Sequence, residues 1–177
     1  MNTATHAEKG IYKVVINAPL DTVWSELVNT TSPRPFFWNS AWDTQAMADG
    51  NTYRMLSADQ RTVGVVGRIV EIDPPNRLVT TFQLTNYDDP PSQVTYELTE
   101  VDGGTELRLI TEQVVAGSKS EKSMADGSRF IAENFKAYVE TGKVTFGARM
   151  MLGMMSLMGA FAPKSMRAEK WPHSAIQ

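Results

Sequence analysis

The chain has 177 residues and a mass of 19.6 kDa, enough for one domain, and its 42% hydrophobic and 21% charged residues are typical of a globular protein. Its formal net charge of −3 differs from the dense basic surface of most nucleic-acid-binding proteins, so no nucleic-acid partner is expected. The chain contains no cysteine, which excludes disulfides and thiolate chemistry and fits a cytoplasmic location.

The N-terminal part of the sequence predicts one strand followed by two short helices. Residues 1–10 are polar, lack the pattern of a secretory signal and are expected to be flexible. Apolar residues alternate with others over residues 11–17, which predicts the strand. Pro19 opens a helix with a buried apolar stripe, and the prolines of residues 32–35 interrupt it. An aromatic cluster follows at once, comprising Phe36, Phe37, Trp38 and Trp42.

Alternation from residue 53 to residue 109 predicts an antiparallel meander. The expected strands contain Tyr53 and Met55, then residues 61–73, 78–84, 94–99 and 107–109, with turns rich in Pro, Gly, Asn and Asp between most of them. One face of such a sheet normally packs on a core while the other contacts water. The alternating apolar residues of these strands are therefore expected to face one common hydrophobic core layer.

A long helix over residues 124–142 is predicted to cover that layer. Ile131, Phe135, Tyr138 and Val139 recur at helical spacing, and Gly142 is placed to end the helix. The expected fold class is therefore α+β, with a curved antiparallel sheet of six to seven strands around a long C-terminal helix.

Five segments resemble the START-like (SRPBCC, polyketide cyclase and lipid transport) superfamily, and most of all its homologues of the activator of heat-shock protein 90 ATPase. They are residues 19–24, 67–79, 94–98, 103–105 and 134–142. The Glu-Ile-Asp-Pro-Pro string at residues 71–75 is the most specific, since it joins a strand end, a turn and the next strand. The resemblance spans residues 11–142 and implies a helix-grip fold with a pocket between the sheet and the long helix. Many relatives have tryptophan where this sequence has Ser128, and the Asn-Asn-Trp-His-Trp signature of the eukaryotic co-chaperone is absent.

Residues with obvious catalytic chemistry are few. His6 and His173 lie near opposite ends of the chain without metal-ligand spacing, so no metal site is expected. No Gly-rich string leads from a strand into a helix, and no cofactor is expected. Glu97, Glu106 and Glu112 fall on the outward face of the sheet.

The predicted apolar interior is the candidate site. Aromatic walls with a few hydroxyl groups commonly line small-molecule sites, although the same residues would equally form a filled core. Tyr53, Tyr96, Tyr138, Thr80 and Thr105 could orient a ligand, since buried hydroxyl groups need partners. The candidate ligand-binding residues are Trp24, Phe37, Trp38, Trp42, Tyr53, Met55, Thr80, Phe82, Tyr96, Phe135 and Tyr138.

Residues 143–177 form a separate C-terminal segment with five basic residues and one acidic residue. An amphipathic helix is predicted over residues 144–162, with an apolar stripe that should cover the domain's own surface or a second copy of the chain. Contact with a membrane surface is a less favoured alternative, and a membrane-spanning helix is disfavoured by Arg149 and by the short length. The stripe comprises Met150, Met151, Met154, Met155, Leu157, Met158 and Phe161.

Three functions are compatible with this sequence. A non-enzymatic binding protein for a small apolar ligand ranks first, followed by a regulator that contacts a chaperone ATPase. A cyclase or hydrolase of polyketide-like substrates ranks last, because the inward-facing residues include almost no acid, base or histidine.

Overall fold

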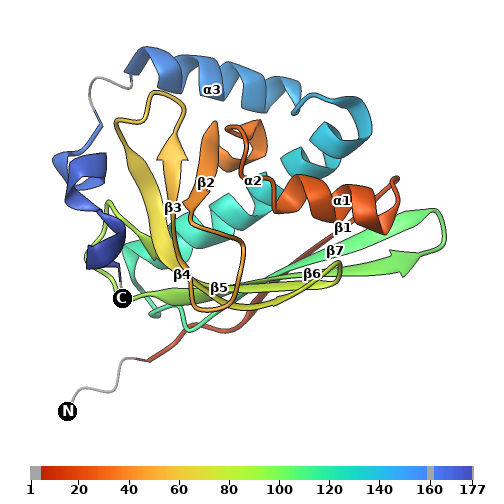
Figure 1. Ribbon diagram of the computed structural model, residues 1–177, viewed down its shortest axis with the longest axis horizontal. Helices are drawn as coiled ribbons and strands as arrows, with labels where there is room; N and C mark the ends of the chain where they lie inside the picture. Colours follow the sequence, from red (N-terminus) through yellow and green to blue (C-terminus); the bar gives the residue numbers. More distant parts are fainter. Residues whose placement is uncertain (1–4, 159–161, 177) are drawn as a thin grey trace.

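The computed structural model, which describes residues 5–158 and 162–176, has a sheet of antiparallel strands in the order β1-β7-β6-β5-β4-β3-β2 (Figure 1). The strands are β1 (Gly10–Ile16), β2 (Ser40–Thr44), β3 (Thr52–Ser57), β4 (Val63–Asp73), β5 (Arg77–Leu84), β6 (Ser92–Val101) and β7 (Gly104–Glu112). The helices are α1 (Leu20–Leu27), the 3-10 helix η1 (Pro35–Phe37), α2 (Lys119–Thr141) and α3 (Phe146–Met158). The predicted α+β helix-grip architecture is confirmed, and its sheet has seven strands where six to seven were expected.

The sheet curves around α2 because its strand pairing is irregular at two places. The register shifts between Met55 and Leu56 where β3 pairs with β4, and between Ile69 and Glu71 where β4 pairs with β5. Bulges of this kind bend a strand and increase its twist. In Figure 1 the strands β4 to β7 pass beneath α2, while β2 and β3 rise beside it.

Helix α2 begins at Lys119, earlier than the predicted residue 124. Ser118 caps it, because its Oγ accepts a hydrogen bond from the Glu121 amide at 3.1 Å. The Glu121 carboxylate in turn accepts one from the Gly117 amide at 2.7 Å. Serine followed three residues later by glutamate is a capping signature, so the sequence did contain the start signal. The helix ends at Thr141, and Gly142 caps it with a φ of 73°.

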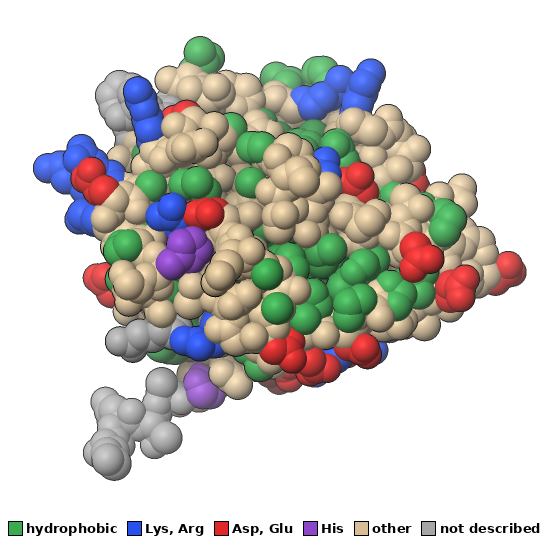
Figure 2. All heavy atoms as spheres, in the orientation of Figure 1, with side chains coloured by type: hydrophobic (Ala, Val, Ile, Leu, Met, Phe, Trp, Pro, Cys, Tyr) green, Lys and Arg blue, Asp and Glu red, His purple; other side chains and the backbone are tan. Residues whose placement is uncertain are grey.

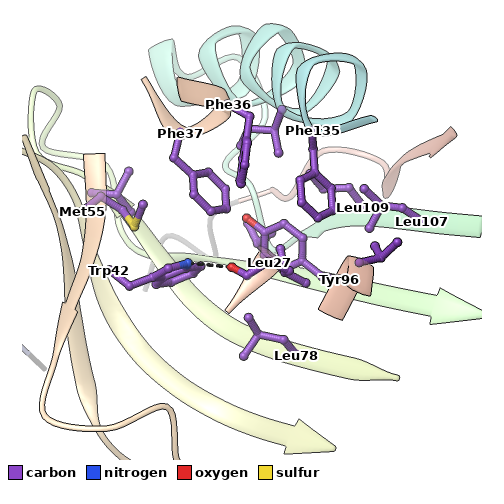
Figure 3. Packing of buried hydrophobic residues seen from close by; sticks show 14 of the residues in the cluster. Leu27, Phe36, Phe37, Trp42, Met55, Leu78, Tyr96, Leu107, Leu109 and Phe135 are labelled. Carbon is purple, nitrogen blue, oxygen red and sulfur yellow. Dashed lines mark hydrogen bonds between the residues drawn. The ribbon is translucent and has the colours of Figure 1, made fainter. Parts of the chain in front are cut away.

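Strand β2 has no counterpart among the predicted strands, whose alternation begins only at residue 53. Its five residues pair with β3, and Trp38 and Asn39 before it adopt φ values of 52° and 55°. These left-handed residues turn the chain out of η1 and into β2. The aromatic residues of the predicted cluster are therefore divided between a helical turn and a strand. Trp42 on β2 then donates its indole N–H to the Leu27 carbonyl oxygen at 3.0 Å (Figure 3).

Described residues near both ends of the chain pack against the rest of the fold. The Ala7 amide donates to the Val114 carbonyl oxygen at 2.7 Å, so residue 7 pairs with the chain just after β7. Val144, Ala148 and Leu152 from the C-terminal segment belong to the main hydrophobic core. Near the end of the chain, Ile176 packs against Val63 and Val66 in a smaller cluster.

Candidate ligand pocket

An apolar cavity of about 670 Å³ lies between the sheet and the helices α2 and α3. Its walls come from η1, from β2 to β7 and from the inward faces of the two helices. Binding sites for small molecules usually have volumes of about 300–1,000 Å³ and predominantly hydrophobic or aromatic walls. The size and composition of the cavity therefore suit one small organic molecule.

Seven of the predicted ligand-binding residues line this cavity. Tyr53 and Met55 on β3 stand beside Trp42 on β2, and Tyr96 on β6 lies across from them. Figure 3 shows Trp42, Met55 and Tyr96 in the interior, on the side of the sheet that faces α2. The seven residues are Phe37, Trp38, Trp42, Tyr53, Met55, Phe82 and Tyr96.

The other four predicted residues lie in the packed part of the interior. Trp24 belongs to the hydrophobic core, and Thr80 accepts a long hydrogen bond of 3.4 Å from the Tyr53 hydroxyl. Phe135 packs against Phe36 with ring centroids 4.7 Å apart, as Figure 3 shows. Tyr138 accepts a hydrogen bond of 3.1 Å from the Arg34 guanidinium. Phe36 packs against both Phe135 and Tyr138, and none of the four residues lines the cavity.

Thr105 also lies away from the cavity, because its hydroxyl donates to the Ala18 carbonyl oxygen at 2.9 Å. It therefore joins β7 to the start of α1 and is not available to a ligand.

Sequence reasoning placed the long helix at the pocket but named Phe135 and Tyr138 from it, whereas other residues of α2 line the cavity. Met124, Gly127, Ser128 and Ile131 line the cavity at helical spacing, and Ser123 lies beside them. All of these except Ser123 lie within the predicted helix over residues 124–142, so the capping signature at residues 118–121 would have added only Ser123. The small Ser128 stands where the resemblance predicts tryptophan, and a tryptophan side chain there would occupy part of the cavity.

Two tyrosine hydroxyl groups differ in their hydrogen bonding within the cavity wall. The Tyr53 hydroxyl donates to the Thr81 carbonyl oxygen at 2.8 Å. Tyr96 has no hydrogen-bond partner for its hydroxyl among the residues that the structure describes. Burial raises the pKa of both phenols above the ordinary tyrosine value, so both remain protonated at neutral pH.

Charge is confined to the outer part of the cavity wall. Within residues 5–158 and 162–176, Asp59 is the one ionisable acid or base with a charge at neutral pH that contributes to the lining, and it is exposed. A hydrogen bond of 2.7 Å from the Ser57 hydroxyl, followed by one from the Arg61 amide, lowers the pKa of Asp59. The interior wall thus offers hydroxyl groups but no carboxylate, histidine or lysine for acid-base catalysis.

Helix α3 covers the cavity with one face and exposes the other. Leu152, Met155 and Ser156 line the cavity. The predicted methionine stripe is therefore divided, because Met150, Met154 and Leu157 are exposed and do not line the cavity, whereas the half-exposed Met155 lies at its edge. The inward positions are Val144, Ala148 and Leu152, four residues apart, so the helix is rotated relative to the expected orientation. The Met158 side chain and Phe161 lie outside the described residues.

The outward face of α3 is strongly apolar. Phe146 and Leu157 are 69% and 85% exposed, and Met150 and Met154 lie between them along the helix. Figure 2 shows hydrophobic side chains together with Lys and Arg side chains along the edge where α3 runs in Figure 1. None of the helices in the described part of the chain has the length and hydropathy needed to cross a membrane.

A curved antiparallel sheet that encloses an apolar cavity with a long helix defines a START-like protein of the helix-grip class. Residues 17–140 match the family model described as "Activator of Hsp90 ATPase homolog 1-like protein". The chain belongs to this family, and the predicted family resemblance is confirmed. No curated protein is significantly similar to it in sequence.

Solved structures support the same fold. CalU16 from Micromonospora echinospora superimposes with a TM-score of 0.60 at 19% identity, covering 86% of each chain. An HSP90 activator from Plasmodium falciparum has a TM-score of 0.58 at 14% identity, covering 83% of this chain and 97% of its own. The Aha1 dimer from Colwellia psychrerythraea has a TM-score of 0.61 at 12% identity, covering 77% of this chain and 99% of its own.

Proposed function

We propose that this protein is a non-enzymatic binding protein that holds one small hydrophobic ligand in the cavity between the sheet, α2 and α3. The observation that carries the proposal is the apolar cavity of about 670 Å³ with aromatic walls and no ionised group in its interior wall. Such a cavity gains binding energy from apolar surface and offers no general acid or base for a reaction.

The test is titration with the neutral fluorescent probe N-phenyl-1-naphthylamine. We expect the wild-type protein to bind one molecule of the probe. Ser128→Trp should weaken binding by about tenfold or more, because the indole would fill cavity volume. Arg129→Trp is the matched control, since Arg129 is the exposed neighbour on the same helix, and its affinity should equal the wild-type value. Absence of saturable binding to the wild type, or equal affinities for the two variants, would overturn the proposal.

A second candidate function is contact with a chaperone ATPase. Family membership and the fold shared with an HSP90 activator from Plasmodium falciparum favour it. The assay is the ATPase rate of Hsp90 from the same host, measured with increasing amounts of the pure protein. A concentration-dependent change in the ATPase rate is expected if this candidate function is correct. A constant rate would exclude the candidate function.

We also propose that the outward face of α3 forms a homodimer contact. The exposed Phe146, Met150, Met154 and Leu157 support this, as does the dimeric structure of the relative from Colwellia psychrerythraea. Analytical ultracentrifugation should give a dimer for the wild type and a monomer for the double variant Met154→Glu and Leu157→Glu. Thr99→Glu, on the exposed end of β6, should stay dimeric as the control. A monomeric wild type that co-sediments with anionic vesicles would instead favour the membrane-surface alternative.

A further inference from the structure

Tyr96 presents a hydrogen-bond donor to the cavity. The residue is 2% exposed and lies on β6, where Leu78 and Leu109 are its cross-strand neighbours. Its hydroxyl has no hydrogen-bond partner in the described part of the chain, whereas the nearby Tyr53 donates to the Thr81 carbonyl oxygen. Among the described residues, the buried side-chain atoms that lack a hydrogen-bond partner belong to Glu26, Arg34, Thr95 and Arg108, so the Tyr96 hydroxyl keeps surface that is open to the cavity. A ligand atom in the cavity can therefore accept its hydrogen bond.

The Tyr96 hydroxyl remains a donor throughout the physiological pH range. Burial raises the pKa of Tyr96, and the neighbouring Tyr53 phenol raises it further. A phenolate in this position would have no cation among the described lining residues to stabilise it. The group therefore donates to an acceptor and cannot serve as an anion that binds a positively charged ligand.

The charge of the cavity wall favours an uncharged ligand. No Lys, Arg or His among the residues that the structure describes lines the cavity, so a carboxylate ligand would be buried without a counterion. The exposed Asp59 adds a negative charge at the outer part of the wall and repels anions. A ligand ammonium group would find no buried carboxylate to pair with.

We propose that the pocket selects an uncharged apolar molecule with a carbonyl oxygen, such as a ketone, ester or lactone, and that Tyr96 donates a hydrogen bond to that oxygen. The inference rests on the proposed binding function and adds the chemical class of the ligand. Tyr96 acts as a specificity-determining residue in this arrangement, and the aromatic walls supply the apolar contact.

The experiment compares 2-acetylnaphthalene with 2-ethylnaphthalene, which have similar shapes but differ in the carbonyl group. Trp38 and Trp42 line the cavity, so quenching of tryptophan fluorescence reports binding of both compounds. Tyr96→Phe should weaken binding of the ketone by about 3- to 10-fold and leave binding of the hydrocarbon unchanged. Tyr53→Phe is the matched control, because the Tyr53 hydroxyl is already bonded to Thr81, and it should weaken neither compound selectively.

A second measurement needs no variant. The carbonyl stretching frequency of bound 2-acetylnaphthalene should lie below its value in hexane, as expected for a hydrogen-bonded carbonyl group. In addition, the wild type should bind 2-naphthoate about tenfold or more weakly than the ketone, because the carboxylate has no buried cation.

The possible results separate the two proposals. If the wild type binds both naphthalenes but Tyr96→Phe weakens them equally, or affects neither, the assignment of Tyr96 is overturned while the binding function stands. A hexane-like carbonyl frequency, or equal affinity for 2-naphthoate, would likewise overturn it. If the wild type binds none of the compounds, the proposed function fails together with the inference.

Discussion

Gly67 lets the Tyr53 side chain cross β4 to reach its hydrogen-bond partner. Tyr53 on β3 is paired with Gly67 on β4, and its hydroxyl donates to the Thr81 carbonyl oxygen on β5. A Cβ atom at Gly67 would collide with that carbonyl oxygen and lie 2.9 Å from Cε1 of the Tyr53 ring. Packing therefore explains the glycine that begins the family motif at residues 67–79. In this wall of the cavity, the backbone of β5 and the Tyr53 ring approach Gly67 too closely for a side chain.

We predict that Gly67→Ala lowers the free energy of unfolding by about 1–3 kcal/mol or more, since the backbone has to move to accommodate the methyl group. Gly64→Ala on the same strand is the matched control, because its nearest atom would be Met166 Cε at 4.0 Å, an ordinary contact. Urea denaturation of both variants gives the comparison. Equal midpoints for the two variants would show that the Tyr53 packing at Gly67 is not required.

Alternation predicted which face a side chain occupies, but not where along the strand the cavity lies. Thr80 and Phe82 share one face of β5, yet Phe82 lines the cavity and Thr80 lies beneath the Tyr53 hydroxyl. The period of a strand defines two faces only. Phe36 packs against Phe135 and Tyr138 in the filled part of the interior, whereas the small Ser128 side chain lies in the cavity wall. Both arrangements are properties of the assembled fold.

At the scale of secondary-structure elements, Glu140 joins the end of α2 to the end of β1. Its Oε1 accepts hydrogen bonds of 2.7 Å from the Lys136 ammonium group and of 2.7 Å from the Asn17 amide. The bond from Lys136 is the main cause that lowers the pKa of Glu140, and the Asn17 amide is the second. The ionised carboxylate thus stabilises the contact between helix and sheet.

We predict that Glu140→Gln destabilises the protein at neutral pH and has no effect in acid. Because the pKa of Glu140 is lower in the folded than in the unfolded chain, its stabilisation is complete above the ordinary glutamate pKa of about 4.3 and is lost as the pH falls through the folded pKa. Melting temperatures of variant and wild type, measured from about pH 7 to about pH 3, should converge. Glu133→Gln, at an exposed position of the same helix, is the control. A difference that stayed constant across this range would contradict the prediction.

Most helices and strands were predictable from the sequence, and the errors in the prediction have local causes. Hydrophobic periodicity identified the body of α2 through Ile131 and Phe135, but it placed the start too late because residues 118–126 are mostly polar. The capping bonds of Ser118 and Glu121 set the start instead. Strand β2 escaped prediction because the left-handed Trp38 and Asn39 precede it, and ordinary propensities give no signal for such residues.

At the scale of the whole molecule, the segment beyond the family match closes the cavity. The match ends at residue 140, whereas α3 lines the cavity with Leu152 and Met155. The chain then runs down beside β3 and β4 in Figure 1, where the Ala168 amide donates to the Arg61 carbonyl oxygen at 2.9 Å. The Arg54 guanidinium donates to the Trp171 carbonyl oxygen at 3.0 Å, and this bond attaches the C-terminal segment to β3.

Sequence periodicity alone could not orient α3, because apolar residues occur on both of its faces. Val144, Ala148 and Leu152 are buried, while Phe146, Met150, Met154 and Leu157 are exposed. Val144, Ala148 and Leu152 join the main hydrophobic core, and the helical period carries no information about which apolar face meets that core. The amphipathic pattern therefore predicted a docked helix but not which residues dock.

Truncation after Gly142 tests whether the C-terminal segment closes the cavity in solution. Removal of Val144 and Leu152 forfeits about 1.5–3 kcal/mol of burial for each side chain, so the melting temperature should fall. Loss of Leu152, Met155 and Ser156 also opens one wall, so bound N-phenyl-1-naphthylamine should dissociate faster in a stopped-flow experiment. Truncation after Met166 is the control, because it keeps α3 and the cavity-lining Pro163 and Met166 but removes the contact of Ile176 with Val63 and Val66. This shorter truncation should lower the melting temperature less and change the dissociation rate little. If removal of the whole segment leaves both quantities at their wild-type values, α3 does not cover the cavity.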